Sequence, residues 1–236
     1  MNSADFSFQG DLEWFLDRKL RGGPVHLVFE DHQTVKHLIE SMGIPHVEVG
    51  SIQADGKEVP FSYHPLDGDR LVVFPNLPGS PVEPRFLLDN HLGRLAALLR
   101  MLGFDCLYHN DFEDDEMAGL LEQDPRILLT RDRQLLMRKA VRYGYCLRSL
   151  EPKEQLQEVV ARFELEPLAR PFTRCLRCNT CLEPVEKAKV FDRLEPRTKL
   201  YYNVFSRCPN CDQIYWQGSH WEQMKSMIDQ LSDLHD

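Results

Sequence analysis

Short apolar runs alternate with helically spaced apolar positions between residues 85 and 165. The runs predict buried strands at Phe86–Leu88, Asp105–Tyr108, Ile127–Thr130 and Tyr145–Leu147. Helical spacing predicts helices over 92–102, 117–121, 135–144 and 152–163. Strands that alternate with helices of about ten residues predict an α/β domain built on a parallel sheet.

Residues 1–80 have a different order of elements. The pattern predicts strands at Phe6–Phe8, Val25–Phe29, Val47–Ile52 and Leu71–Phe74. A helix over 35–42, capped by Thr34, is predicted between the second and third strands. Asp55-Gly56 and Asp67-Gly68 are turn signals. Two strands, a helix and further strands in about 75 residues are typical of a β-grasp fold.

Prolines punctuate the chain at 75, 78, 81 and 84, and this run predicts a stiff linker. We therefore expect three parts: a ubiquitin-like β-grasp domain over 1–80, an α/β domain over 84–165 and a cysteine-rich domain over 166–236. The last stretch, 222–236, predicts a weakly amphipathic helix that packs rather than carrying function.

Acidic residues follow the predicted strands of the α/β domain. Asp89, Asp111 and Asp132 each come after a strand, and Asp114-Asp115-Glu116 begins a helix. Parallel strands bring their carboxyl ends to one edge, where the carboxylates would repel unless a cation lies among them. Oxygen ligands of this kind suit Mg²⁺ or Mn²⁺. Helix capping is the alternative, because Asp is a favoured N-cap residue.

Cysteines gather near the end of the chain. Five of the seven lie between Cys175 and Cys211, and they include the turns Cys175–Cys178 and Cys208–Cys211. Two C-x-x-C turns supply the four thiolates of a structural Zn²⁺ site, and the strands of a ribbon are expected at Val190-Phe191 and Tyr201–Phe205. Cys181 and His220 are competing ligands, and a redox dithiol is the alternative chemistry.

The composition is that of a soluble protein with a core, since 42% of the 236 residues are hydrophobic and 28% are charged. We expect a cytoplasmic protein, because the chain lacks a membrane-length apolar run and a secretory signal pattern. The net charge of −9 is uneven. Residues 170–207 carry 9 basic and 4 acidic side chains, a balance of +5, with aromatic residues interleaved. Such a segment suits single-stranded RNA.

These motifs resemble a known family. Asp89 with Leu92–Ala96, Leu102–Asp105, Asp114–Glu116 and Ile127–Arg133 is similar to the Mut-seven C-terminal RNase family, a branch of the PIN-like nucleases with a zinc ribbon. The resemblance implies that Asp89, Asp132 and one or more acids of the triplet hold metal. We predict Asp89, Asp114, Asp115 and Asp132 as Mg²⁺ or Mn²⁺ ligands, and Asp89, Asp115, Glu116 and Asp132 as the catalytic acids.

A second resemblance covers the first domain. Val35–Glu40 and Asp67–Pro75 resemble ubiquitin-like sulfur carriers of thiamine and molybdopterin synthesis. Those carriers end in a free Gly-Gly, whereas this chain continues through Asn76–Pro81, so we expect a domain that docks a protein partner. The function predicted overall is metal-dependent hydrolysis of RNA phosphodiesters. The alternative is an RNA-binding adaptor with a weak or degenerate nuclease site.

Overall fold

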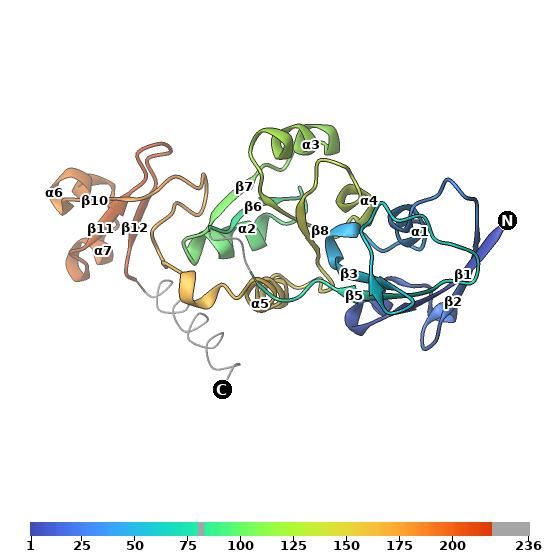
Figure 1. Cartoon of the computed structure of the whole chain (residues 1–236). Helices are drawn as coiled ribbons and strands as arrows, with labels where there is room; N and C mark the ends of the chain where they lie inside the picture. Colours follow the sequence, from blue (N-terminus) through green and yellow to red (C-terminus); the bar gives the residue numbers. More distant parts are fainter. Residues whose placement is uncertain (80–82, 219–236) are drawn as a thin grey trace. The chain divides into compact units, whose positions relative to one another are not determined.

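The computed structural model describes residues 1–79 and 83–218 (Figure 1). These residues form two compact units. Unit 1 combines Met1–Pro78 with Phe112–Arg148, and unit 2 combines Gly79–Asp111 with the chain from Ser149 onward. The predicted helix over 222–236 and the competing ligand His220 lie outside the described residues.

A five-stranded sheet forms the first part of unit 1. Its strands are β1 (Asn2–Phe8), β2 (Val25–Phe29), β3 (Val49–Ala54), β4 (Lys57–Glu58) and β5 (Arg70–Pro75), in the order β2-β1-β5-β3-β4. Strand β1 is parallel to β5, and the other neighbours are antiparallel. One α-helix, α1 (Val35–Ser41), and the 3₁₀ turns η1 (Gly10–Phe15), η2 (Arg18–Leu20) and η3 (His46–Glu48) connect them. This is the predicted β-grasp arrangement.

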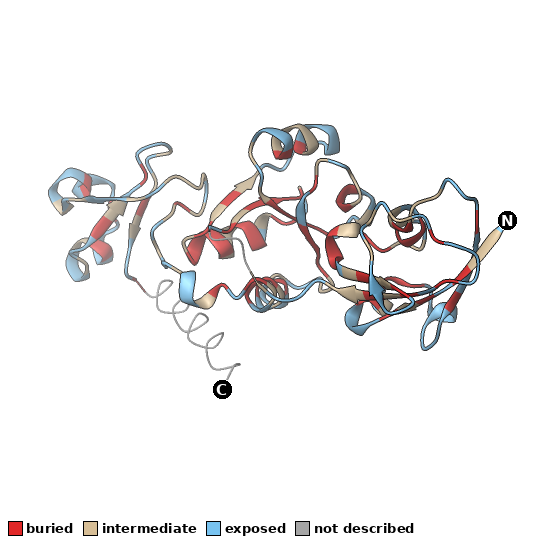
Figure 2. Cartoon of the chain, viewed as in Figure 1, coloured by how far each residue is buried: buried red, intermediate tan, exposed pale blue. Residues whose placement is uncertain are grey.

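Local sequence explains these elements. Thr34 caps α1 as predicted, because its Oγ1 accepts the backbone N–H of His37 at 3.3 Å. Phe6, Ile39 and Leu71 are fully buried. Buried segments occur on both the helix and the sheet of this part (Figure 2). The strand predicted from Val47 begins two residues later, because residues 46–48 form the turn η3 after Pro45.

The second part of unit 1 contains α3 (Asp114–Gln123), β8 (Ile127–Thr130), α4 (Arg133–Leu136) and β9 (Tyr143–Cys146). Strands β8 and β9 are parallel, with Ile127 opposite Tyr143. The helix predicted over 135–144 is wrong in length, because α4 ends at Leu136. Residues from Tyr143 onward pair with β8, so the chain must leave the helix early to reach the sheet.

Unit 2 begins with β6 (Arg85–Leu88), α2 (Gly93–Met101) and β7 (Asp105–Tyr108), and α5 (Pro152–Phe163) and η4 (Glu166–Leu168) follow after the chain returns. Strands β6 and β7 are parallel. Gly103 ends α2 with a φ of 93°, and a Cβ there would lie 2.1 Å from the Arg170 carbonyl oxygen, so only glycine fits.

The rest of unit 2 is a small antiparallel sheet of β10 (Glu183–Val185), β11 (Phe205–Arg207) and β12 (Ile214–Trp216), with α6 (Lys187–Val190), η5 (Phe191–Arg193) and α7 (Pro196–Tyr201). The predicted strands at Val190-Phe191 and Tyr201–Phe205 are mostly wrong. Val190 and Leu194 are four residues apart on a helical path and pack on Phe205, and only Phe205 enters a strand. Within the described ranges, every helix is too short or too polar to cross a bilayer.

Candidate functional site

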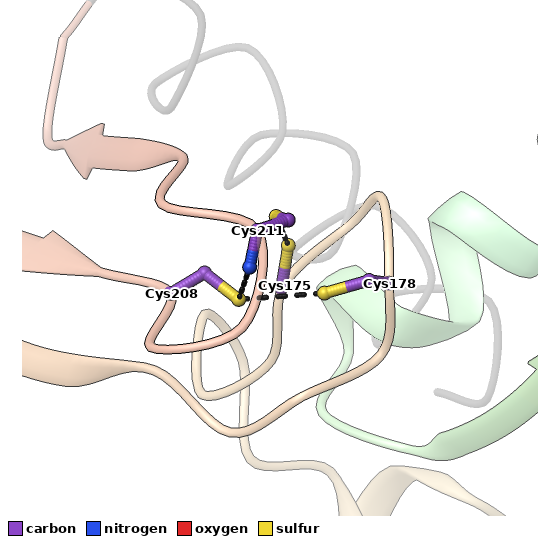
Figure 3. Close-up of side chains that lie close together, drawn as sticks. All are labelled: Cys175, Cys178, Cys208 and Cys211. Carbon is purple, nitrogen blue, oxygen red and sulfur yellow. Dashed lines mark hydrogen bonds between the residues drawn. The ribbon is translucent and has the colours of Figure 1, made fainter.

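Four cysteines meet in unit 2. The sulfur atoms of Cys175, Cys178, Cys208 and Cys211 all lie within 4.8 Å of one another (Figure 3). Cys175 Sγ is 3.5 Å from Cys211 Sγ, and Cys178 Sγ is 3.3 Å from Cys208 Sγ. Among residues 1–79 and 83–218, this is the one group of three or more His, Cys, Asp or Glu side chains whose ligand atoms lie this close together.

The two C-x-x-C turns have the same backbone hydrogen bonds. The N–H of Cys175 donates to Thr180, and the N–H of Asn179 donates back to Cys175, at 2.8 and 2.9 Å. The corresponding bonds of the second turn are Cys208 to Gln213 and Asp212 to Cys208, at 2.9 and 3.0 Å. Asn179 and Asp212 both have positive φ, so each turn closes through the left-handed region. Two equivalent turns thus present two sulfurs each.

The thiols of this cluster differ in acidity. Burial opposes ionisation of Cys178, but hydrogen bonds with Thr180, Asn210 and Cys208 together outweigh it and lower the pKa to about 5. Burial raises the pKa of Cys211 to about 12. A divalent cation among four sulfurs favours the thiolate form of all of them, and tetrahedral sulfur ligation suits Zn²⁺. The donor set therefore fits a metal such as zinc.

Cys181 does not take part in the cluster. It is exposed, and its backbone bridges to Arg174. The sequence left Cys181 open as a competing ligand, and the structure brings together the outer pairs on which the prediction was based.

Side chains attach the first cysteine turn to β7. Arg100 is buried and donates to the carbonyl oxygens of Cys106, Leu176 and Arg177 at 2.8 to 3.1 Å. Asn179 accepts the N–H of Cys106 at 3.0 Å through its side chain. The spacing of the sequence gave no signal for these contacts, because Arg100 lies in an ordinary amphipathic helix.

Asp89 directly follows β6 and is 5% exposed. Its Oδ1 accepts the N–H of Asn90 at 2.6 Å, and its Oδ2 is 3.9 Å from His91 Nε2. Tyr108 donates its hydroxyl proton to the Asn90 carbonyl at 2.9 Å. A Cβ on Gly93 would lie 2.6 Å from that hydroxyl oxygen, so glycine admits the tyrosine. Tyr108 thereby fixes the turn that carries Asp89, a role that the sequence did not reveal.

The acids of α3 face an arginine in unit 1. Arg138 Nη2 is 3.6 Å from Asp114 Oδ2, and Arg138 Nη1 donates a short hydrogen bond to Asp115. The bond to Asp115 raises the pKa of Arg138, and the charges of Asp114 and Asp132 act in the same direction. Arg138 was missed by sequence reasoning, because it lies beyond the last turn of α4 and outside any motif.

Asp132 caps α4, as the alternative reading of the strand-end acids proposed. Its Oδ1 accepts the N–H groups of Gln134 and Leu135 at 2.7 and 3.4 Å, and its own N–H donates to Thr130 Oγ1 at 2.9 Å. Asp89 caps no helix, because the N-cap of α2 is Leu92. Asp111 and Glu116 are exposed. That these acids act together stays a prediction.

Arginines near the predicted site differ in what they can contact. Arg94 and Arg131 are exposed. Arg133, which directly follows Asp132, donates to the Phe15 carbonyl at 2.7 Å and lies 4.9 Å from the ring centroid of Trp14. Its charge is thus used to hold the β-grasp part of unit 1.

The β-grasp part of unit 1 also contacts β9. Glu48, which is buried, accepts the N–H of Cys146 at 2.6 Å, and its other oxygen is 3.5 Å from Arg148. Arg148 donates to the Cys146 carbonyl and to Asp11, both at 2.8 Å. Burial and the charge of Glu48 raise the pKa of Cys146 to about 11, so this core thiol stays protonated.

These features define a class of protein: a ubiquitin-like region joined to an α/β region whose parallel strands end in acids, with a four-cysteine cluster. The family comparison makes this specific. The Mut7-C RNAse domain matches residues 84–228, and the Mut7-C ubiquitin domain matches residues 1–79. The chain belongs to the Mut7-C RNAse domain family.

Individual relatives are more distant. The exonuclease mut-7 homolog of Homo sapiens is 30% identical over 141 residues, which is 57% of this chain. The chain spans only 15% of that protein's length. Two crystal structures of the small archaeal modifier protein SAMP1 of Haloferax volcanii are 14% identical and cover 33% and 34% of this chain and all of the archaeal chains, with TM-scores of 0.27 and 0.26.

Proposed function

We propose that this protein is a metal-dependent ribonuclease that hydrolyses RNA phosphodiester bonds. Its membership of an RNase domain family supports the reaction class, and the similarity to a human relative named as an exonuclease supports a nuclease. The observation that carries the proposal is Asp89, a carboxylate that directly follows a parallel strand, is almost fully buried and is held by a fixed turn.

The proposed metal-holding acids are Asp89, Asp132 and one or more of Asp114, Asp115 and Glu116. Carboxylate oxygens are the ligands that Mg²⁺ and Mn²⁺ prefer, so the donor chemistry fits. When bound, such an ion supplies activation of a water molecule and neutralises charge on the phosphate. Arg138 already compensates Asp114 and Asp115, and it would have to release one of them for that acid to act.

The residues of the chain itself have clear tasks in this proposal. Tyr108 and Gly93 keep the Asp89 turn in place, which limits the movement of the carboxylate when the metal and RNA bind. Asp132 is held by the first N–H groups of α4, so its Oδ1 is oriented before any ligand arrives. A buried acid and an oriented acid are what a preorganised site requires.

The finer fold assignments belong to the same proposal. We assign the α/β part to the PIN-like fold and the cysteine cluster with β10 to β12 to a zinc ribbon, with domain boundaries near residues 80 and 165. The ribbon's zinc would be structural, since four sulfurs leave no open position for a substrate. The β-grasp domain would dock a protein partner.

The decisive experiment is cleavage of labelled single-stranded and structured RNA by the purified protein, with Mn²⁺ added or left out. Asp89→Asn and Asp132→Asn test the acids. Asparagine keeps the shape of aspartate and is itself a good N-cap, so Asp132→Asn removes charge while retaining the cap of α4. Asp17→Asn is the matched control, because Asp17 caps η2 through the N–H of Lys19 at 3.2 Å.

We expect Mn²⁺-dependent cleavage that falls at least about a hundredfold in both site variants, the loss typical of removing a key electrostatic group, and persists in Asp17→Asn. Cleavage that survives both substitutions would mean that the acids are assigned wrongly.

One observation favours a second function, an RNA-binding adaptor. The ion pairs of Arg138 neutralise two of the candidate acids, as expected of a site that has lost its metal. The same assay separates the two functions. An adaptor binds RNA but shows no cleavage with any divalent ion, and its Asp89→Asn variant binds RNA as the wild type does.

A further inference from the structure

A small cavity opens on the face of the three-stranded sheet in unit 2. Its volume is about 130 Å³, and we call it the ribbon pocket. Its polar and aromatic lining comes from Arg174, Ser206, Tyr215 and Gln217, and its apolar lining includes Phe172, Leu182 and Val204. Ser206 and Tyr215 are direct cross-strand partners of β11 and β12, so they share one face of the sheet. Phe205 and Ile214 instead belong to the small core of this region.

The walls of the ribbon pocket are fixed by hydrogen bonds. The Tyr215 hydroxyl is 3.1 Å from Cys175 Sγ and accepts the N–H of Leu176 at 3.1 Å. Arg174 donates to the carbonyl oxygens of Gly103 and Asn179 at 3.1 and 3.0 Å. A planar ring and a planar guanidinium are therefore held in place before any ligand binds, which lowers the entropic cost of binding.

We infer that the ribbon pocket binds one unpaired nucleobase of a single-stranded RNA; this rests on the proposed function. The cavity is the size of a single ring system, and aromatic and guanidinium planes are the surfaces on which bases stack. The Gln217 amide and the Ser206 hydroxyl offer donors and acceptors for base edges. Arg174 and Tyr215 supply the two planar groups, and Phe172 and Leu182 add apolar walls. The ring of Trp216 lies on the other side of the sheet, 6.4 Å from that of its strand partner Phe205.

Charge favours RNA over an apolar protein segment as the occupant. The surrounding stretch 170–207 carries 9 basic and 4 acidic side chains, a balance of +5, within a chain of net charge −9. A polyanion would be drawn to this region of an otherwise acidic protein. The phosphates would contact the basic residues while one base leaves the stack and enters the pocket.

The test measures binding, not cleavage, by the full-length, zinc-loaded Asp89→Asn protein. Fluorescence anisotropy compares a short single-stranded RNA with the same strand made abasic, and the ratio of the two affinities reports base recognition. Val204→Glu places a charge at the pocket rim, where Val204 is 71% exposed. Leu200→Glu is the matched control, since Leu200 is 72% exposed on α7 and does not line the pocket.

We expect the intact RNA to bind about tenfold more tightly than the abasic strand, the effect of roughly one stacked base. Val204→Glu should bring that ratio close to one, whereas Leu200→Glu should leave it unchanged and lower both affinities alike. Equal affinities for both strands in the parent protein would overturn the inference. So would an unchanged ratio in Val204→Glu, and a lower melting temperature of that variant would then assign the pocket to an apolar protein segment.

The assay also keeps the two proposals apart. Base-dependent binding without any cleavage by the wild type would support the base-binding pocket and contradict the nuclease proposal. Cleavage lost in Asp89→Asn, with no base dependence in binding, would do the reverse.

Discussion

Strand β7 pairs with β6 on one side, strand β9 pairs with β8 on one side, and the other side of each is closed by side chains around a buried cysteine. In β7, the N–H of Cys106 donates to Asn179 and its carbonyl accepts from Arg100. In β9, the N–H of Cys146 donates to Glu48 and its carbonyl accepts from Arg148. In both strands, one side-chain acceptor and one arginine satisfy the backbone N–H and carbonyl groups that the strand edge would otherwise leave unpaired.

The two closures differ in how the arginine's charge is balanced. Burial opposes the charge of Arg148, but Glu48 together with Tyr145, Asp11 and Cys146 outweighs this effect, and the pKa of Arg148 is raised. Burial lowers the pKa of Arg100, and the groups that oppose this effect are Cys106, then Cys175 and Cys178 of the cysteine cluster, and Asp105. The charge of Arg148 is therefore balanced mainly by a carboxylate of the β-grasp part, and that of Arg100 in part by the cysteine cluster.

This difference indicates that the cysteine cluster stabilises β7 through Arg100, in addition to the two turns that contain its cysteines. A four-thiolate zinc site carries a net negative charge, and Arg100 donates to the carbonyls of Leu176 and Arg177 in its first turn. Metal binding should therefore stabilise β7 as well as the sheet of β10 to β12, whereas the stability of the β9 edge should not depend on metal.

The largest expected effect is loss of the metal. Chelation or Cys208→Ser should abolish the cooperative unfolding transition of unit 2, because structural zinc sites supply roughly 10 kcal/mol of apparent binding free energy. Circular dichroism melts with metal analysis measure this. Cys181→Ser is the control, since Cys181 is exposed and outside the cluster. One bound zinc in Cys208→Ser and none in Cys181→Ser would contradict the ligand assignment.

Arg100→Met should have the next largest effect. The variant leaves three buried or half-buried carbonyl groups without their donor, at about 1–3 kcal/mol each, so unfolding free energy should fall by about 5 kcal/mol. Urea unfolding measures the change, and zinc affinity should fall with it. Arg94→Met on the same helix is the control, because Arg94 is exposed. Equal stability of the two variants would mean that Arg100 does not hold the β7 edge.

At the β9 edge, Glu48→Gln should cost about 3 kcal/mol, the low end for removing one partner of a buried ion pair. Glutamine can still accept the N–H of Cys146, and Arg148 retains Asp11, so the loss should be smaller than for Arg100. Urea unfolding with and without chelator tests the comparison. The cost should be the same in both conditions, and Glu58→Gln on the exposed strand β4 should cost almost nothing. A cost that depends on metal would break the distinction between the edges.

Much of the fold follows from local patterns in the sequence. Three-residue apolar runs predicted β6 and β8 because these strands are buried on both faces. Thr34 and Pro152 predicted helix starts because a cap and a ring-fixed φ act within a few residues. The four ligands of the cysteine cluster were predicted equally well, since the spacing within each C-x-x-C turn fixes the geometry of that turn.

The features that the sequence did not predict depend on residues that are distant in the chain. The end of α4 at Leu136 is set by pairing with β8, and the helices around Val190 are set by packing on Phe205. Arg138 and Tyr108 carry no motif, because their roles arise from acids and turns elsewhere in the chain. Arg133 directly follows the predicted acid Asp132, but its side chain donates to the Phe15 carbonyl in the β-grasp part of unit 1.

The smallest predicted effect concerns the thiol at the β9 edge. The pKa of Cys146 is raised from 9.0 to about 11 by burial and by Glu48, so the native state keeps a proton that the unfolded chain loses as the pH rises through this interval. The unfolded state then binds fewer protons, and stability falls with rising pH. Two pKa units correspond to between about 2 and 3 kcal/mol. This contribution is fully present below about pH 9 and lost by about pH 11.

Unfolding of the wild type and Cys146→Ala by urea across that range isolates the contribution of this thiol from the other groups that titrate there. Between about pH 9 and pH 11, the unfolding free energy of the wild type should fall by about 2 to 3 kcal/mol more than that of Cys146→Ala. Below about pH 8, the two pH curves should run parallel, because the thiol is protonated in both the folded and the unfolded state. Parallel curves throughout would mean that Cys146 ionises as easily in the native protein as in the unfolded chain. The edge closed by Glu48 would then be open to water, and the contrast between the two edges would lose its electrostatic basis.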